Sequence, residues 1–249
     1  MQILSPLNYL IRKSLQVIVA AIIIFVSLSL TPAYAQTQPF LRTPYYGQKG
    51  IRSNFDHEYP NYGVDNSLMG FNGVRRGPPA SSTNCTNGID GSCYNGHDGY
   101  DFALNYEPII STAPGTVTQA RWQVPGIRQG PDALLGLYIE IDHENGYRTR
   151  YGHLSTIAVT EGQHVEAGQL IGTSGNTGYS TGAHLHFGLR LFVNGVWQPV
   201  DPFGWTGAGT DPWQESSGAI SYCLWLDGGW VNYCGGISRS LPAPVNGGE

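Results

Sequence analysis

Charged residues, and basic residues in particular, are scarce in this chain. Only 12% of its 249 residues are charged, and 13 basic against 18 acidic residues give a formal net charge of −5. A protein that binds nucleic acid through its phosphates needs a basic face, so we exclude that class. Scarce charge together with 34 glycines and 12% aromatic residues is typical of an extracellular β protein with many turns.

Cysteine is also rare, and no pair has the Cys-x-x-Cys spacing of a cysteine zinc site. The four cysteines, Cys85, Cys93, Cys223 and Cys234, fit an exported protein that forms disulfides. Four cysteines allow three connectivities, of which we expect the local pairs Cys85–Cys93 and Cys223–Cys234. For the second pair, a hairpin turn at residues 228–229 would place Cys223 directly opposite Cys234, within disulfide range.

Long apolar runs are limited to one, near the N-terminus. Arg12 and Lys13 precede an uncharged stretch that ends in Ala33-Tyr34-Ala35, a small-x-small cleavage site. The pattern predicts a signal peptide over residues 1–35 and an extracytoplasmic mature protein, either secreted or periplasmic. The alternative is an uncleaved anchor, since the run approaches membrane-spanning length, and membrane association is expected only in that case.

No segment has the periodicity of a long amphipathic helix, and we find no internal repeat. Alternating residues and Asn-Gly turns instead predict an all-β fold with an antiparallel β-sheet core and long loops that line a groove. The expected strands are Ile51–Phe55, Thr116–Trp122, Leu137–Asp142, Tyr147–Tyr151, Gly182–Leu191 and Pro199–Trp205. The chain is accordingly divided into a signal peptide (1–35), a loop-rich N-terminal segment of the catalytic domain (36–96), the core (97–205) and a C-terminal appendix with the disulfide hairpin (206–249).

Two short motifs carry the metal-binding signal. His184 and His186 are separated by one residue in a β-prone stretch, so both imidazoles lie on one strand face. Upstream, His97 and Asp101 form a His-x-x-x-Asp motif. Imidazole nitrogens and a carboxylate are zinc ligands, and three of them leave one tetrahedral position open for catalysis. We therefore expect one zinc ion per chain, bound by His97, Asp101 and His186.

A zinc hydrolase also needs groups that move protons and stabilise the oxyanion. His184 shares its strand face with His186 and should lie near the metal. His153 is the second candidate, and its alternative is a partly exposed histidine at the end of a strand.

Several further stretches resemble the LytM/lysostaphin-type zinc endopeptidases. The resemblance covers about residues 97–203 and is carried, besides His97 and Asp101, by residues 136–146, Tyr151-Gly152-His153-Leu154, residues 162–172, residues 175–182, His184-Leu185-His186-Phe187 and Val200-Asp201-Pro202. It implies the duplicated hybrid motif of that family, with a narrow groove. It also implies that His97, Asp101 and His186 bind zinc, that His153 and His184 are catalytic, and that the protein cleaves peptide cross-links of bacterial peptidoglycan, as an expected monomer.

The chain departs from the family in the Phe-Gly-x-Arg element, where it has Ser53-Asn54-Phe55-Asp56-His57. His57, His143 and His164 are expected to be ordinary surface or turn histidines, unless His57 reaches the groove. Two other functions stay open at this point. One is a non-catalytic cell-wall binding or regulatory module on the same fold, and the other is a zinc peptidase that acts on proteins.

Overall fold

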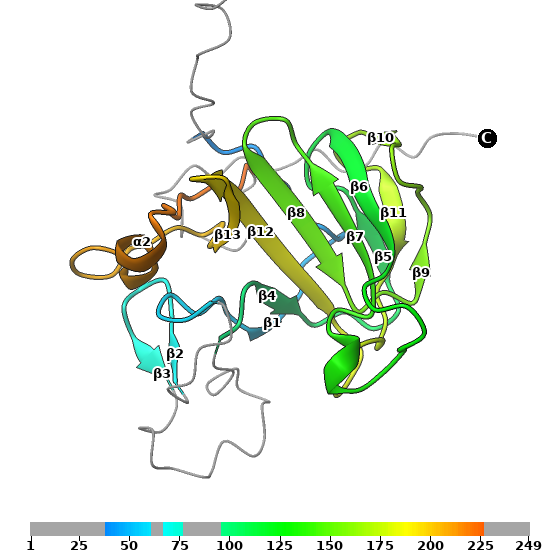
Figure 1. Cartoon of the computed structure of the whole chain (residues 1–249), viewed down its shortest axis with the longest axis horizontal. Helices are drawn as coiled ribbons and strands as arrows, with labels where there is room; N and C mark the ends of the chain where they lie inside the picture. The colour runs from blue at the N-terminus through cyan, green and yellow to red at the C-terminus, as the bar shows by residue number, and fades with distance from the viewer. Residues whose placement is uncertain (1–37, 61–66, 77–95, 227–249) are drawn as a thin grey trace, which may run out of the picture. The chain divides into compact units, whose positions relative to one another are not determined.

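The regular secondary structure consists almost wholly of antiparallel strands (Figure 1). The computed structural model describes residues 38–60, 67–76 and 96–226. Within these ranges one short α-helix and one 3₁₀ turn accompany thirteen strands, so the predicted all-β class is confirmed. In the same ranges, no helix combines the length and apolar character needed to cross a membrane.

The elements follow one another along the chain in short pieces. They are β1 (Ile51–Ser53), β2 (Leu68–Met69), β3 (Arg75–Arg76), β4 (Tyr100–Phe102), β5 (Pro108–Ile110), β6 (Gly115–Trp122), η1 (Pro131–Ala133), β7 (Leu137–Asp142), β8 (Tyr147–Gly152), β9 (Thr156–Ile157), β10 (His164–Val165), β11 (Leu170–Thr173), β12 (Leu185–Val193), β13 (Val196–Val200) and α2 (Pro212–Ser217).

The main sheet has eight strands, in the order β1-β4-β12-β8-β7-β6-β10, with β13 also paired to β12. A smaller sheet, β5-β11-β9, and the hairpin β2-β3 complete the described strands. Strand β12 is the longest and pairs with β4, β8 and β13. It therefore brings residues from distant parts of the chain to one place in the sheet (Figure 1).

Side chains alternate between the two faces of this sheet. On β8, Tyr147 and Tyr151 are fully buried in the hydrophobic core. Arg148 and Arg150 of the same strand point to the opposite face, where both bind the Glu140 carboxylate. Phe187 of β12 packs in the core beside Tyr151. Because side chains on a strand alternate, His186 lies on the face opposite Phe187, the same face as the arginines.

Two glycines are required by the backbone, one in the turn between β12 and β13 and one where the chain approaches β12 closely. Asn194 and Gly195 join β12 to β13 with φ values of 51° and 82°, and such a pair of positive φ angles defines the type I′ hairpin turn. At Gly99, a Cβ atom would lie 2.3 Å from the backbone oxygen of Phe187. Only glycine therefore lets the chain before β4 approach β12 so closely.

Some predicted boundaries and environments are wrong. Strand β12 begins at Leu185 rather than Gly182, and the closing strand is Val196–Val200 rather than Pro199–Trp205. His57 and His143 are buried instead of lying on the surface. Both are held by hydrogen bonds to groups far along the sequence, which no local pattern reveals.

Other predictions fall outside the described residues. The proposed signal peptide at residues 1–35 is one of them, and so are Cys85, Cys93 and Cys234. The signal peptide and both disulfide pairs therefore stay predictions, as does the division of the chain into segments.

Candidate metal centre

Three side chains converge on one point at the outer face of the main sheet. His97 lies just before β4, Asp101 lies on β4, and His186 stands opposite Asp101 on β12. His97 Nε2 is 3.0 Å from His186 Nδ1 and 3.1 Å from Asp101 Oδ1. His186 Nδ1 is 3.2 Å from Asp101 Oδ1. The structure thus brings together the three residues expected to bind zinc.

The donor set fits a zinc ion. In tetrahedral coordination with bonds of about 2.0–2.1 Å, ligand atoms lie roughly 3.3 Å from one another, close to the separations seen here. His97 Nδ1 is 2.9 Å from the carbonyl oxygen of Asn54, to which it donates its proton. That hydrogen bond fixes the tautomer and leaves the lone pair of Nε2 to face Asp101 and His186.

The second nitrogen of His186 also faces a partner. His186 Nε2 is 3.3 Å from Asp98 Oδ1, and Arg190 donates to the other carboxylate oxygen at 2.7 Å. A carboxylate behind a ligating histidine orients the ring and raises its basicity. Neither Asp98 nor Arg190 emerged from the sequence, although Asp98 stands inside the His-x-x-x-Asp motif.

Electrostatics favour a cation at this point. Burial alone would lower the pKa of His186, but its contacts with Asp101 and Asp98 raise that pKa to about 9. Burial alone would raise the pKa of Asp101, but His97, His184 and His186 lower it well below its ordinary value. The two carboxylates are therefore ionised, and their negative charge stabilises a proton or a metal ion between the imidazoles.

Two more histidines stand beside these ligands. The ring centroid of His153 is 4.6 Å from that of His184 and 6.0 Å from that of His186. His184 Nε2 is 3.5 Å from Asp101 Oδ1. All five histidine and aspartate positions predicted from the sequence therefore meet in one cluster.

Each of these two histidines donates its Nδ1 proton to a backbone carbonyl. His153 Nδ1 is 2.7 Å from the oxygen of Thr177, and His184 Nδ1 is 2.7 Å from that of Gly182. The backbone of His153 has a φ of 60°, a left-handed conformation that non-glycine residues adopt rarely and that concentrates at functional sites. In both rings Nε2 is then the nitrogen left to exchange protons.

Their environments separate the two histidines. Burial, reinforced by the charges of His184 and His186, lowers the pKa of His153 to about 3. Burial also acts against the charged form of His184, but the hydrogen bond and charge of Asp101 outweigh it and raise its pKa. Pairs of titratable groups whose pKa values diverge are typical of acid–base partners.

The sequence of residues 95–202 matches Peptidase family M23. Within the chain, 106 residues are 46% identical to Peptidoglycan DD-endopeptidase ShyA of Vibrio cholerae, over 42% of this chain and 22% of that protein. The solved catalytic domain of the antimicrobial peptidase lysostaphin from Staphylococcus simulans is 36% identical, over 47% of this chain and 80% of that one, with a TM-score of 0.36. A solved zinc-containing peptidase of Vibrio cholerae is 30% identical. The match covers 66% of this chain and 39% of that one, with a TM-score of 0.42.

These matches define the class as metallopeptidase, in agreement with the histidine and aspartate cluster. Residues 95–202 match the model of peptidase family M23, and 119 residues are 38% identical to lysostaphin, which confirms the resemblance to the LytM/lysostaphin-type enzymes. The chain spans less than a quarter of the length of ShyA and of full-length lysostaphin.

Proposed function

We propose that the protein is an exported, zinc-dependent endopeptidase that hydrolyses peptide cross-links of bacterial peptidoglycan. The observation that carries the proposal is the convergence of His97, Asp101 and His186 within about 3 Å of one another, with His153 and His184 beside them. The name of a relative, Peptidoglycan DD-endopeptidase ShyA, supports the proposed substrate.

Three side chains would hold one zinc ion per chain, which leaves a coordination position for water or substrate. Bound there, zinc would lower the pKa of a water molecule and polarise the substrate carbonyl. Asp98 would hold the ring of His186 in place, and the Asn54 carbonyl would do the same for His97.

His153 and His184 would act as the general base and the general acid. Because burial lowers the pKa of His153, its ring stays neutral across the physiological range, and the lone pair of Nε2 would be the acceptor for a proton of the attacking water. His184, whose pKa is raised, is the better donor to the departing amine. His184, when protonated at Nε2, would also donate a hydrogen bond to the oxyanion.

The substrate and the location follow from the same proposal. Peptidoglycan lies outside the cytoplasmic membrane, so the chain must be exported, which agrees with the signal peptide expected at residues 1–35. We propose processing after Ala35, a monomer as the active form, and membrane association only if that segment is retained. Mass spectrometry of the exported protein gives its N-terminus directly, and an N-terminus at Met1 would contradict processing.

The test compares peptidoglycan with protein as substrate. Purified cell walls of several cross-link types are digested with the zinc-loaded protein, and the fragments are identified by mass spectrometry. His153→Ala and His184→Ala serve as inactive variants, and His164→Gln, at an exposed histidine, serves as the matched control. We expect cleavage of a cross-linking peptide bond that the two alanine variants lack.

Other outcomes would replace the proposal. If zinc binds but no cell wall is cleaved, the protein is a binding or regulatory module. If proteins are cleaved and cell walls are not, it is a protein-directed peptidase.

A further inference from the structure

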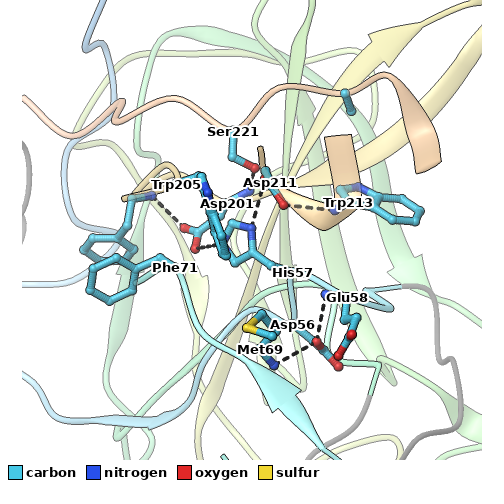
Figure 2. Close-up of polar contacts among 12 residues, drawn as sticks. Asp56, His57, Glu58, Met69, Phe71, Asp201, Trp205, Asp211, Trp213 and Ser221 are labelled. Carbon is cyan, nitrogen blue, oxygen red and sulfur yellow. Dashed lines mark hydrogen bonds and ion pairs between the residues drawn. The ribbon is translucent and has the colours of Figure 1, made fainter. Parts of the chain in front are cut away.

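His57 lies in the interior between two carboxylates (Figure 2). Its Nε2 atom is 2.9 Å from Asp201 Oδ2, and its Nδ1 atom is 3.0 Å from Asp211 Oδ2. The three side chains are 0%, 0% and 2% exposed. We call these three residues the His57 cluster. It joins the segment after β1, the residue after β13 and the residue that caps α2.

Both ring nitrogens of His57 face carboxylate oxygens, and this decides its protonation state. A neutral imidazole has only one N–H group, whereas an imidazolium has two. Burial alone would lower the pKa of His57, but the hydrogen bonds to Asp201 and Asp211, and then their charges, raise it to about 9. His57 is therefore a buried cation at neutral pH.

The groups around His57 hold the two carboxylates in place. Asp201 also accepts a hydrogen bond from the Tyr100 hydroxyl of β4, at 2.7 Å. Asp211 accepts from the backbone N–H of Trp213 at 3.0 Å, as the cap of α2. The rings of Phe55 and Trp205 pack against the imidazole, with centroids 5.0 and 4.9 Å away.

On its own segment, His57 is flanked by Asp56 and Glu58. The Asp56 carboxylate accepts hydrogen bonds from the backbone N–H groups of Glu58 and Met69 (Figure 2) and from that of Gly96. The Glu58 carboxylate binds Arg75. These charges are thus directed to groups other than the imidazole, and Asp201 and Asp211 are the carboxylates that contact His57.

The segment that carries His57 also holds the first metal ligand. The Asn54 carbonyl accepts the Nδ1 proton of His97 at 2.9 Å. The backbone N–H of Asp56 donates to the carbonyl oxygen of His97 at 3.0 Å. The Asp56 carboxylate accepts from the N–H of Gly96, also at 3.0 Å. Residues 54–56 therefore fix both the backbone and the ring of His97.

We propose that His57 is a positioning residue for the metal centre: clamped between Asp201 and Asp211, it anchors the segment that orients His97. The inference rests on the proposed function in one respect, namely that His97 binds zinc. It makes the sequence on both sides of residues 95–202 part of the site, because His57 precedes that range and Asp211 follows it. Both are therefore needed for full metal affinity.

The test measures zinc affinity in the full chain by competition with a chromophoric chelator at neutral pH. In His57→Gln, the glutamine cannot bridge both carboxylates as a cation. We expect zinc binding to weaken by about tenfold or more, the range typical of residues behind metal ligands. The matched control is His143→Gln, which removes another buried histidine, hydrogen-bonded to the Pro114 carbonyl and Thr149. Its zinc affinity should stay within about twofold of the original protein.

A second readout does not depend on stability. Proton NMR of the full chain at about pH 8 should show two ring N–H protons for His57, as an imidazolium requires. If His57→Gln does not fold, the variant Asp211→Asn tests the positioning role instead. It removes one carboxylate, so one ring proton should disappear at pH 8 and zinc binding should weaken.

The outcomes separate this inference from the proposed function. If the original protein binds no zinc, the proposed function fails. If it binds zinc and His57→Gln binds it as tightly as His143→Gln does, His57 has no positioning role and the inference is overturned. A single ring proton on His57 at pH 8 in the original protein would overturn it as well.

Discussion

Among the described residues, two buried clusters of histidine and aspartate differ in the direction of their donor atoms. In the metal centre, one atom each from His97, Asp101 and His186 lies within 4.8 Å of the other two. In the His57 cluster, Asp201 and Asp211 bind opposite nitrogens of one ring. Residue types and burial are nearly the same. Donor atoms that converge from three side chains could hold a metal ion between them, whereas in the His57 cluster a single imidazole lies between two carboxylates.

The hydrogen bonds of the outer nitrogens explain the difference. In the metal centre, His97 donates Nδ1–H to a backbone carbonyl, so its Nε2 lone pair is available to a metal. In the His57 cluster both nitrogens face carboxylates, Nε2 through a hydrogen bond to Asp201 and Nδ1 through an ion-pair contact with Asp211, and an imidazolium leaves no lone pair for a metal. The comparison teaches that a histidine's role depends on what each of its two nitrogens faces, more than on burial or on the number of nearby acids.

The largest effect is expected at the convergent cluster. His186→Ala removes a ligand whose Nδ1 faces both His97 and Asp101, so metal and activity should be lost together. Metal analysis after dialysis, paired with an assay on cell walls, measures both quantities. Full zinc occupancy in this variant would refute the ligand assignment.

A smaller effect is expected beside the ligands. His153→Ala and His184→Ala should retain zinc and lose about 10²- to 10⁴-fold in turnover, the usual contribution of acid–base groups. The same metal analysis and assay apply, with His164→Gln as the control. If either variant loses its metal on mild dialysis, that histidine is a ligand and the two roles must be reassigned.

The divergent cluster should make stability depend on alkaline pH. The pKa of His57 is raised from 6.5 to about 9 in the folded protein, so folding takes up a proton between those values. The stabilisation is fully present below the unfolded pKa of about 6.5 and is lost as the pH rises through about 9, and it amounts to about 3 kcal/mol.

Denaturant unfolding of the original protein and of His57→Gln at about pH 6 and pH 10 measures this stabilisation. The difference in unfolding free energy between the two proteins should be larger at pH 6, because His57 of the folded original protein is charged at pH 6 and neutral at pH 10. An equal difference at both pH values would mean that His57 does not titrate as proposed.

The smallest effect is expected at a histidine that belongs to neither cluster. His164 is 59% exposed and lies 3.6 Å from the exposed Glu166. Exposed ion pairs of this kind contribute about 0–1 kcal/mol. His164→Gln should therefore change the unfolding free energy by less than about 0.5 kcal/mol and leave zinc content unchanged. Loss of zinc in this variant would contradict the prediction that the exposed His164 has no part in zinc binding.

Much of the fold was determined by the sequence itself. Period-two alternation predicted β6 and β7 with bounds within one residue of those observed, because the pleat makes every second side chain face the core. The Asn194-Gly195 pair predicted a hairpin turn, because these residue types tolerate the positive φ angles that the turn requires and that the structure has. His97, Asp101 and His186 were found because two short motifs, His-x-x-x-Asp and His-x-His, occur together in a β-prone chain, and the resemblance to the LytM/lysostaphin-type enzymes implies the same ligands.

Tertiary structure alone decided the rest. The partner of His57, Asp201, is 144 residues away, and no local pattern distinguishes such a histidine from one in a surface turn. Asp98 became a partner of His186 only once β4 paired with β12, and Asn54 acts through a backbone carbonyl, which leaves no trace in residue type. Alternation and ligand spacing are local properties of the chain. The protonation and role of a buried histidine depend on the groups that folding brings to each of its nitrogens.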